Sequence, residues 1–466
     1  MTASRSVSTM SSTTTITQLE DAHISLSHSG SILGRQQSNT NSSYALRPLT
    51  DEQPPSNAVE AIPDGGYGWV VVAASAGFLF WTNGFMTAWG VLQTEILRQA
   101  QLKVSTATIT FVGSLGLFCM VAFGLPSVRL LKLLGARNAC LVAACLVGLS
   151  PVLTSFTLDN IGGLFVTAGA LFGIGASVLY TASNSIPVQW FSSKLGRANG
   201  IIKAGGGVGA TVLPIAAQGL IDRVGLAWAF RTFGFLMLAM ILPSALLLKE
   251  RAPTQQHSAR LFDTSLFKSL VFIGLCLAGA VSTLVLFVPP FFLPLFSSSI
   301  GLSASTGAGL VALFGASTTI GRIFSGFACD WLGPFNTLAL TLLTNALSML
   351  AIWPVSTSLA PLIFFAAING SANGSFFVAM PTAIAALAGP GRASGAMSIG
   401  TSFWAPGYLL GTPIAGILIG ATGAAKASSI EPYRAAIFYA GAMALVGGVL
   451  SLAARLKFDA KLGKKL

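Results

Sequence analysis

The chain has 466 residues, of which 53% are apolar and only 9% charged, against about 25% charged in an average soluble domain. So few ionisable side chains cannot cover the surface of a soluble protein of this size, which argues against a soluble enzyme. The net charge of +12 occurs without a solvated basic domain, so nucleic acid is not an expected partner. Five cysteines and three histidines show no disulfide or metal-site pattern, and we expect no metal ion and no cofactor.

Residues 1–62 are rich in Ser, Thr, Asn and Gln and nearly lack aromatic residues. This composition cannot bury a core and predicts a disordered tail. The segment lacks the basic start and apolar stretch of a signal peptide.

From Trp69 onward, apolar runs recur to the end of the chain, and each is long enough to cross a bilayer. They predict an all-α membrane protein with 12 transmembrane helices in two six-helix pseudo-repeats. The expected spans are 68–92, 106–125, 138–156, 161–188, 199–220, 227–248, 266–296, 305–329, 337–354, 359–387, 393–419 and 433–454. Glycine clusters such as Gly205-Gly206-Gly207 and Gly209 suit close helix crossings.

The two halves of the chain repeat short motifs. Gly196-Arg197-Ala198-Asn199-Gly200 returns as Gly391-Arg392-Ala393-Ser394-Gly395, and Leu134-Gly135 returns as Leu332-Gly333. Parallel repeats of six helices are an architecture of secondary transporters. The expected organisation is a tail at 1–62, one half at 63–248, a central loop at 249–265, a second half at 266–454 and a basic tail at 455–466.

The Lys and Arg residues give the expected orientation. Placing both termini in the cytoplasm puts 18 of the 26 cations on that side and 5 outside. We therefore expect both tails and the central loop to be cytoplasmic, in a multi-pass protein of the plasma membrane.

Three motifs carry a resemblance to a known family. Pro63-Asp64-Gly65-Gly66-Tyr67-Gly68-Trp69 precedes the first span, and a block from Trp190 to Gly205 opens the fifth. The third motif covers Gly389 to Ser394 and Leu410 to Pro413. Together they resemble the fungal members of the monocarboxylate porter family of the major facilitator superfamily. The resemblance implies the major facilitator fold and secondary active transport by alternating access.

This chain departs from the animal lactate carriers of that family at two positions. Thr87 and Thr318 stand where those carriers have a Lys and an Asp, whereas Arg322 matches their arginine in the eighth helix. Lactate is therefore a poor candidate substrate.

Charged residues within the spans are few. All 14 carboxylates fall in tails, in loops or at span ends, so a proton relay through a buried carboxylate is not supported. Arg322 and Lys203 are cations within spans, and each needs a partner or a polar cavity. For Arg322 a substrate anion is one candidate partner, and snorkelling to the cytoplasm is the alternative for both residues.

Polar and aromatic residues inside the spans complete the candidate site. The polar ones could line it or could bond one helix to another. The polar candidates are Asn83, Thr87, Tyr180, Asn184, Thr318, Asn369 and Asn373. The rings that could stack on a substrate, or simply pack, are Phe291, Phe292, Phe376, Phe377, Phe403 and Trp404.

A conformational latch is expected at the cytoplasmic ends of the helices. The family's loop motif fits at Gly326-x-x-x-Asp330-x-x-Gly333, while Lys132 replaces the acid in the first half. A carboxylate in this motif can pair with a cation and hold one conformation. Asp330, Arg137 and Asp64 are the candidate latch residues.

These features predict a secondary transporter of a small organic anion, with the solute and the bilayer as partners. The alternatives are export of a larger secondary metabolite and import of a vitamin-like ring compound, as by the riboflavin carrier of this family. A membrane sensor that moves no solute is a further alternative. An enzyme is not expected, because the spans contain no acid pair, histidine or metal cluster.

Overall fold

The computed structural model describes residues 64–99, 105–191, 194–251, 264–389, 393–422 and 430–459. They all belong to one compact unit, Ala61–Leu466. The predicted tail at 1–62, Arg392, most of the central loop and the last seven residues lie outside the described part.

Every regular element in the described residues is helical. The α-helices of the first half are α1 (Gly68–Gln99), α2 (Thr106–Ala122), α3 (Gly124–Leu134), α4 (Ala136–Thr154), α5 (Ile161–Leu164), α6 (Phe172–Ser185), α7 (Leu195–Val224) and α8 (Leu226–Leu246). Those of the second half are α9 (Leu270–Thr283), α10 (Val288–Ser299), α11 (Ala304–Leu332), α12 (Pro334–Leu347), α13 (Leu359–Ala388), α14 (Ala393–Ser402), α15 (Ala405–Ala421) and α16 (Glu431–Phe458). Short π or 3₁₀ segments are η1 (Phe165–Leu171), η2 (Pro187–Gln189), η3 (Thr264–Lys268), η4 (Ser348–Ile352) and η5 (Trp353–Val355).

Several of these segments join into longer membrane-spanning runs. Within the described residues, 11 helices are long and apolar enough to cross a membrane, with Ile161–Gln189 and Leu270–Ser299 each counted as one. The pair α2 and α3 passes the same test together and raises the number to 12. The helices therefore agree with the predicted 12 spans if this pair is one span.

The pair α2 and α3 differs from the prediction. The sequence predicted a span at 106–125 followed by a loop, but the chain bends by 56° and stays helical to Leu134. Pro126 lacks the N–H that would bond to the Ala122 carbonyl, which explains a bend at this point. As a result, Arg129 and Lys132 lie on a helix instead of a loop.

Helix α1 is also longer than predicted. It runs to Gln99 instead of ending at residue 92, because no Gly or Pro interrupts the last turns. The Glu95 carboxylate, expected beyond the span, is consequently part of α1 and is only 6% exposed.

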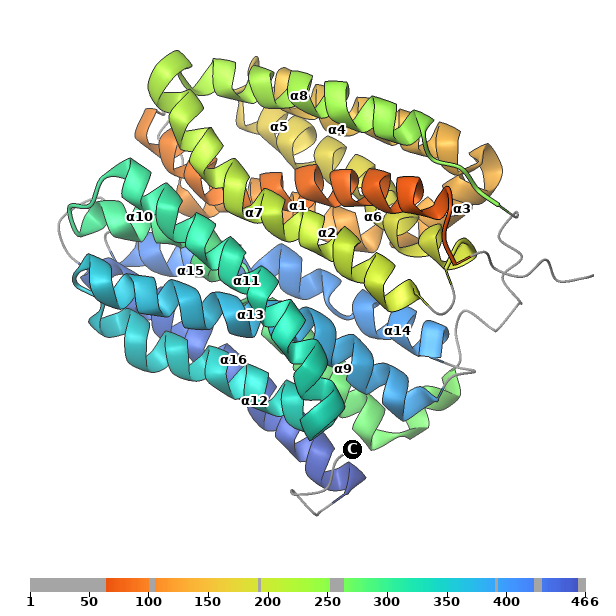
Figure 1. Ribbon diagram of the computed structural model, residues 1–466. Helices are drawn as coiled ribbons and strands as arrows, with labels where there is room; N and C mark the ends of the chain where they lie inside the picture. The colour runs from red at the N-terminus through yellow and green to blue at the C-terminus, as the bar shows by residue number, and fades with distance from the viewer. Residues whose placement is uncertain are drawn as a thin grey trace, which may run out of the picture. The chain divides into compact units, whose positions relative to one another are not determined.

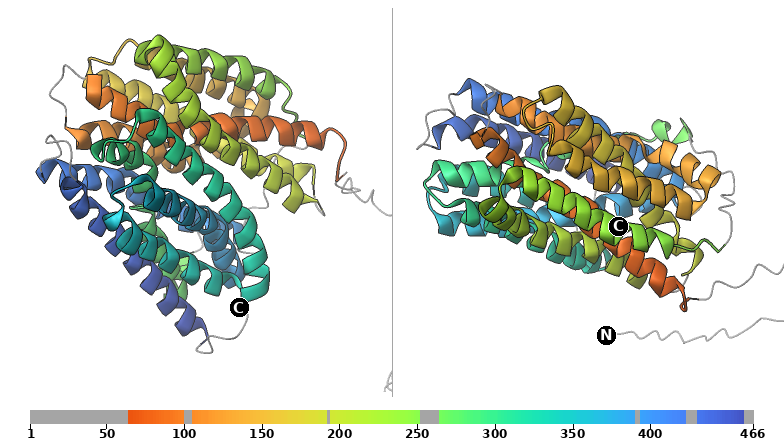
Figure 2. Two further views of the ribbon diagram at one scale, coloured as in Figure 1. Left: turned by 60° about the vertical axis from the view of Figure 1, so that its left-hand side comes forward. Right: turned by 90° about the horizontal axis from the view of Figure 1, so that it is seen from above.

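The helices form two halves, α1–α8 and α9–α16, that pack mainly within themselves (Figures 1 and 2). In the first half α1 packs on α7 and α4 on α8, and in the second α11 packs on α13 and α12 on α16. The halves meet where α2 packs on α15, α7 on α11 and α1 on α10. We call the end of the bundle where α1 begins and α16 ends the terminal face, and the opposite end the far face (Figure 1).

The repeated Leu-Gly motifs form equivalent corners in the two halves. Gly135 joins α3 to α4 with φ +75°, and Gly333 joins α11 to α12 with φ +88°. Such positive φ angles favour glycine, which has no Cβ. The sequence repeat thus corresponds to a repeated local structure.

The predicted close crossing at the glycine cluster is confirmed. A Cβ on Gly205 would lie 2.5 Å from the Ala76 carbonyl oxygen, and one on Gly209 would lie 2.0 Å from that of Phe80. Only hydrogen at these positions lets α1 and α7 approach so closely.

The motif before α1 forms what we call the aromatic clasp, made of Tyr67, Trp69, Trp190 and Phe191. The Trp69 and Phe191 ring centroids lie 4.8 Å apart, and those of Tyr67 and Trp190 lie 5.8 Å apart. The Tyr67 hydroxyl donates to the carbonyl of Leu247 at 2.7 Å. The clasp therefore joins the start of α1, the segment before α7 and the end of α8 at the terminal face.

Candidate functional site

Arg322 lies on α11, one turn after Thr319, which packs against Gly207 of α7 in the first half. Its Nε is buried and has no hydrogen-bond partner among the described residues, and its guanidinium carbon lies 5.4 Å from the centre of the Phe377 ring. The side chain as a whole is partly exposed. A guanidinium with an unbonded donor next to a ring is suited to bind an anionic group.

Lys203 of α7 lies next to two residues of α6. Its Nζ donates to Asn184 Oδ1 at 2.7 Å and lies 4.8 Å from the centre of the Tyr180 ring. The Asn184 side chain in turn donates to the Tyr180 backbone carbonyl at 2.6 Å. Three predicted site residues of the first half are thus brought together.

The two cations lie at the same level of the contact between α7 and α11. Gly207, one turn after Lys203, packs against the Thr319 side chain, and Thr319 is one turn before Arg322. Tyr408 of α15 is buried, and its ring lies 5.5 Å from that of Phe287. Among the described residues neither cation forms an ion pair with a carboxylate. The site therefore combines two positive charges, tyrosine hydroxyls and aromatic rings.

Three other predicted residues have partners inside the second half. Thr318 Oγ1 donates to the Gly370 carbonyl at 3.1 Å, which joins α11 to α13. Asn369 donates to Ser348 Oγ at 2.8 Å, and Asn373 donates at 2.6 Å to the Leu286 carbonyl at the break between α9 and α10. These contacts correspond to the helix–helix alternative that the sequence left open.

Asn83 and Thr87 lie on α1. Thr87 Oγ1 donates to the Asn83 backbone carbonyl at 2.9 Å within the helix. The Asn83 side-chain nitrogen lies 2.7 Å from the position that a Cβ on Gly206 would take, so it faces α7. Both residues belong to the crossing of α1 and α7.

The candidate latch residues lie at the terminal-face ends of their helices. Asp330 is exposed in the last turn of α11, and Arg137 is exposed in the first turn of α4. The Asp64 carboxylate accepts a hydrogen bond from the Lys194 backbone N–H at 3.3 Å. That bond lies within the first half, between the starts of α1 and α7.

Side chains near the far face also join the halves. Gln93 is fully buried, and its side-chain nitrogen donates to the Phe291 carbonyl of α10 at 2.6 Å. Ser114 of α2 and Thr412 of α15 form a second hydrogen bond between the halves.

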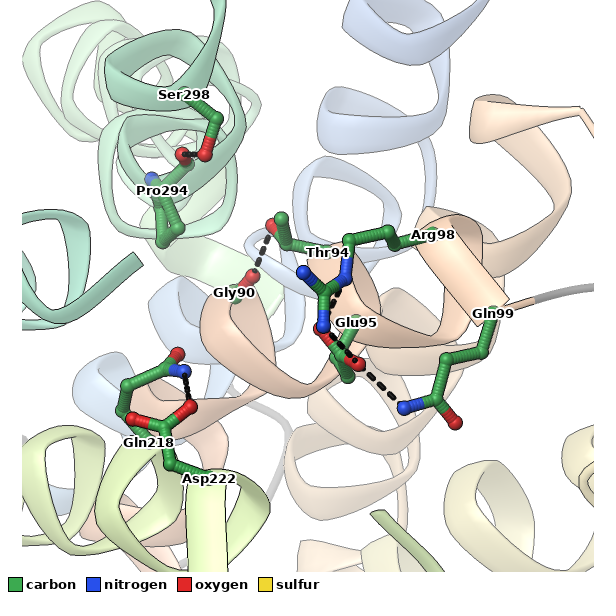
Figure 3. A network of polar contacts seen from close by, with 9 residues as sticks. All are labelled: Gly90, Thr94, Glu95, Arg98, Gln99, Gln218, Asp222, Pro294 and Ser298. Atoms are coloured by element: carbon green, nitrogen blue, oxygen red, sulfur yellow. Dashed lines mark hydrogen bonds and ion pairs between the residues drawn. The ribbon is translucent and has the colours of Figure 1, made fainter. Parts of the chain in front are cut away.

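A polar network surrounds the end of α1 (Figure 3). Glu95 forms an ion pair with Arg98 at 2.9 Å and accepts a bond from Gln99. On α7, Gln218 donates to Asp222 at 2.8 Å.

Sequence reasoning missed Tyr408, Gln93 and Glu95. A buried role for Glu95 could have been inferred from the absence of Gly and Pro between residues 92 and 99. The chain offers no comparable signal for Tyr408 or Gln93, because their roles depend on helices that are distant in sequence.

Comparison with known proteins gives consistent results. The family model described as Major Facilitator Superfamily matches residues 69–366. An MFS-type transporter of Gibberella moniliformis is 30% identical and covers 87% of this chain and 94% of its own. The aspyridones efflux protein of Emericella nidulans is 29% identical, with coverages of 85% and 80%. Among solved structures, a D-xylose–proton symporter aligns with a TM-score of 0.65 at 15% identity, covering 86% of this chain and 99% of its own. These matches confirm the predicted fold class.

Proposed function

Because the chain belongs to the Major Facilitator Superfamily and is a multi-pass secondary transporter, we propose that it exports an organic acid with a ring-bearing scaffold. The acid binds between the two halves, which alternate in exposing the site to the two sides of the membrane. Relatives named as efflux proteins, for aspyridones and for agnestins, support export.

The observation that carries this proposal is the state of Arg322. Its Nε is buried with no hydrogen-bond partner among the residues that the structure describes, on a helix that packs against the first half and beside the Phe377 ring. An unpaired cation in a low-dielectric environment is costly, so the site favours an anion that bonds to the guanidinium. The partly exposed ring of Phe377 supplies a surface on which an aromatic scaffold can stack.

The chain resembles the monocarboxylate porters in its motifs, but we do not propose lactate as its substrate. Thr87 and Thr318 replace the Lys and Asp of the lactate carriers, and Thr318 bonds α11 to α13. Import of a vitamin-like compound is the second candidate, since the same rings would suit it. A sensor that moves no solute would show no flux at all.

Orientation and location are part of the same proposal. We place the protein in the plasma membrane with both termini in the cytoplasm, so the terminal face is cytoplasmic. Asp330 and Arg137, which are exposed at that face in opposite halves, then pair as a latch when the halves close there.

The test compares Arg322→Lys and Arg322→Ala in cells that lack the native gene. Intracellular and extracellular metabolites are compared first, and the acid retained by the knockout is then assayed in vesicles containing purified protein. Arg322→Lys should lower flux per folded molecule by roughly 10-fold or more, because an ammonium cannot make the bidentate contact. Arg322→Ala should abolish flux while making the empty protein at least as stable as wild type.

The matched control is Arg231→Lys on α8. Arg231 is bonded to Ser155 at 3.0 Å and stacked on Trp228, and neither partner belongs to the candidate site. This variant should retain flux. Normal flux in Arg322→Lys would falsify the proposed anion contact, and loss of folded protein with normal flux per molecule would assign Arg322 a structural role.

A further inference from the structure

The candidate site contains two cations, and within the described part of the chain each of them has only neutral contacts. Lys203 uses one of its three ammonium donors on Asn184 Oδ1 and lies over the Tyr180 ring. Arg322 lies beside Phe377, and its buried Nε bonds to none of the described residues. Amide oxygens and ring faces orient a cation, but they do not neutralise it.

The described carboxylates do not compensate this charge. The buried one, Glu95, lies two turns beyond Thr87 toward the far face and is paired with Arg98. When a monoanion binds Arg322, the partly exposed Lys203 ammonium therefore has no described carboxylate as a partner and remains available to a second acidic group. Lys203 and Arg322 each lie one turn from the contact between Gly207 and Thr319, so their like charges also repel each other.

The two cations come from opposite halves. Lys203 belongs to α7 of the first half and Arg322 to α11 of the second, and these two helices pack on each other. A ligand with two acidic groups could therefore bridge the halves, and both contacts would change when the halves rock apart.

From this juxtaposition we propose that the substrate is an organic dianion. One acidic group binds Arg322, the other binds Lys203, and the scaffold between them lies beside the rings of Tyr180 and Phe377. The inference rests on the proposed function and specifies its substrate class.

The test uses benzoate and isophthalate, which share a ring and differ by one carboxylate. Each is titrated at constant ionic strength against the purified full-length protein, and the shift in melting temperature gives the apparent Kd. Wild type should bind isophthalate roughly 10-fold more tightly than benzoate, the effect expected for one additional charged hydrogen bond. Lys203→Gln should lose this preference, and Lys203→Arg should keep it.

Lys194→Gln is the control, because Lys194 is an exposed cation just before α7 whose backbone N–H, not its side chain, contacts Asp64. It should behave as wild type. Three results would contradict the proposal of a dianionic substrate. They are equal affinity of wild type for the two acids, binding of neither acid, and an unchanged preference for isophthalate in Lys203→Gln.

The same titration separates this inference from the proposed function. If both acids bind wild type equally and Arg322→Lys weakens the binding of both, the proposed organic-acid site is supported and the proposed dianionic substrate is contradicted. If Arg322→Lys binds both acids as wild type does, the proposed function itself fails.

Discussion

Glycines create equally close backbone contacts inside each half and between the two halves. Within the second half, a Cβ on Gly374 of α13 would lie 1.9 Å from the Thr318 carbonyl oxygen of α11. Between the halves, a Cβ on Gly90 of α1 would lie 2.1 Å from the Pro290 carbonyl oxygen of α10. In local geometry the two contacts are nearly the same.

Their consequences differ because the halves of a rocking transporter move relative to each other. The contact at Gly374 is present whenever the second half is folded. The contact at Gly90 is present only while the halves meet near the far face, as they do here. A bulky side chain at Gly374 should therefore destabilise the folded second half. The same side chain at Gly90 should shift the equilibrium between conformations.

The largest effect is expected for Gly374→Val. The new side chain would force α13 away from α11, which we expect to cost about 3 kcal/mol or more in folding free energy. The yield of monodisperse protein after detergent extraction measures this loss. Gly309→Val on α11 is the control, because nothing lies within 4 Å of the position of its Cβ.

An intermediate effect is expected for Gly90→Val. The protein should fold, but a penalty of about 1–3 kcal/mol on the closed far face would shift the equilibrium roughly 5- to 150-fold toward an open far face. A cysteine at Ala107, which packs against Gly416 across the seam, reports this opening through its labelling by an impermeant maleimide. The exposed Cys145 is first replaced by serine.

Gly219→Val is the matched control for this measurement, since the Cβ position of Gly219 is open. If Gly90→Val instead misfolds as badly as Gly374→Val, the distinction between the two classes of contact is wrong.

The smallest effect is expected for Gln93→Leu. It removes one hydrogen bond between the halves, to Phe291, and also removes a buried side-chain oxygen that bonds to no residue the structure describes. The closed far face should lose at most about 1 kcal/mol, or roughly fivefold in the equilibrium. Gln218→Leu, whose bond to Asp222 stays within α7, should leave maleimide labelling unchanged. A larger effect for Gln218→Leu than for Gln93→Leu would contradict this assignment.

Much of the fold follows from the sequence, because apolar runs directly reflect the affinity of a segment for lipid. Apolar runs do not show which side chains are buried against another helix. Glu95 and Glu431 each pair with an arginine three residues later, at 2.9 and 2.8 Å. Yet their side chains are 7% and 64% exposed, because Glu95 lies on α1, which packs on α7, α8 and α10, whereas Glu431 is the first residue of α16.

The residues of the candidate site could likewise be predicted only in part from the sequence. Arg322, Lys203, Tyr180 and Asn184 could be named from the sequence as polar residues within spans. Which of them meet depends on the packing of α7 on α11 and on the contact of Lys203 with α6. Asn369 and Asn373 are also polar residues within a predicted span, but their side chains form hydrogen bonds between helices. Polarity identifies candidates, and only tertiary packing separates a ligand contact from a helix–helix bond.

The aromatic clasp has a consequence for protein engineering. All four of its rings lie in the first half, so it makes the same contacts whichever side of the membrane the transporter faces. Substitutions there should alter the lifetime of the protein in detergent without altering its turnover number. The clasp is thus a place where a more robust variant can be selected for biochemical work without biasing the transport cycle.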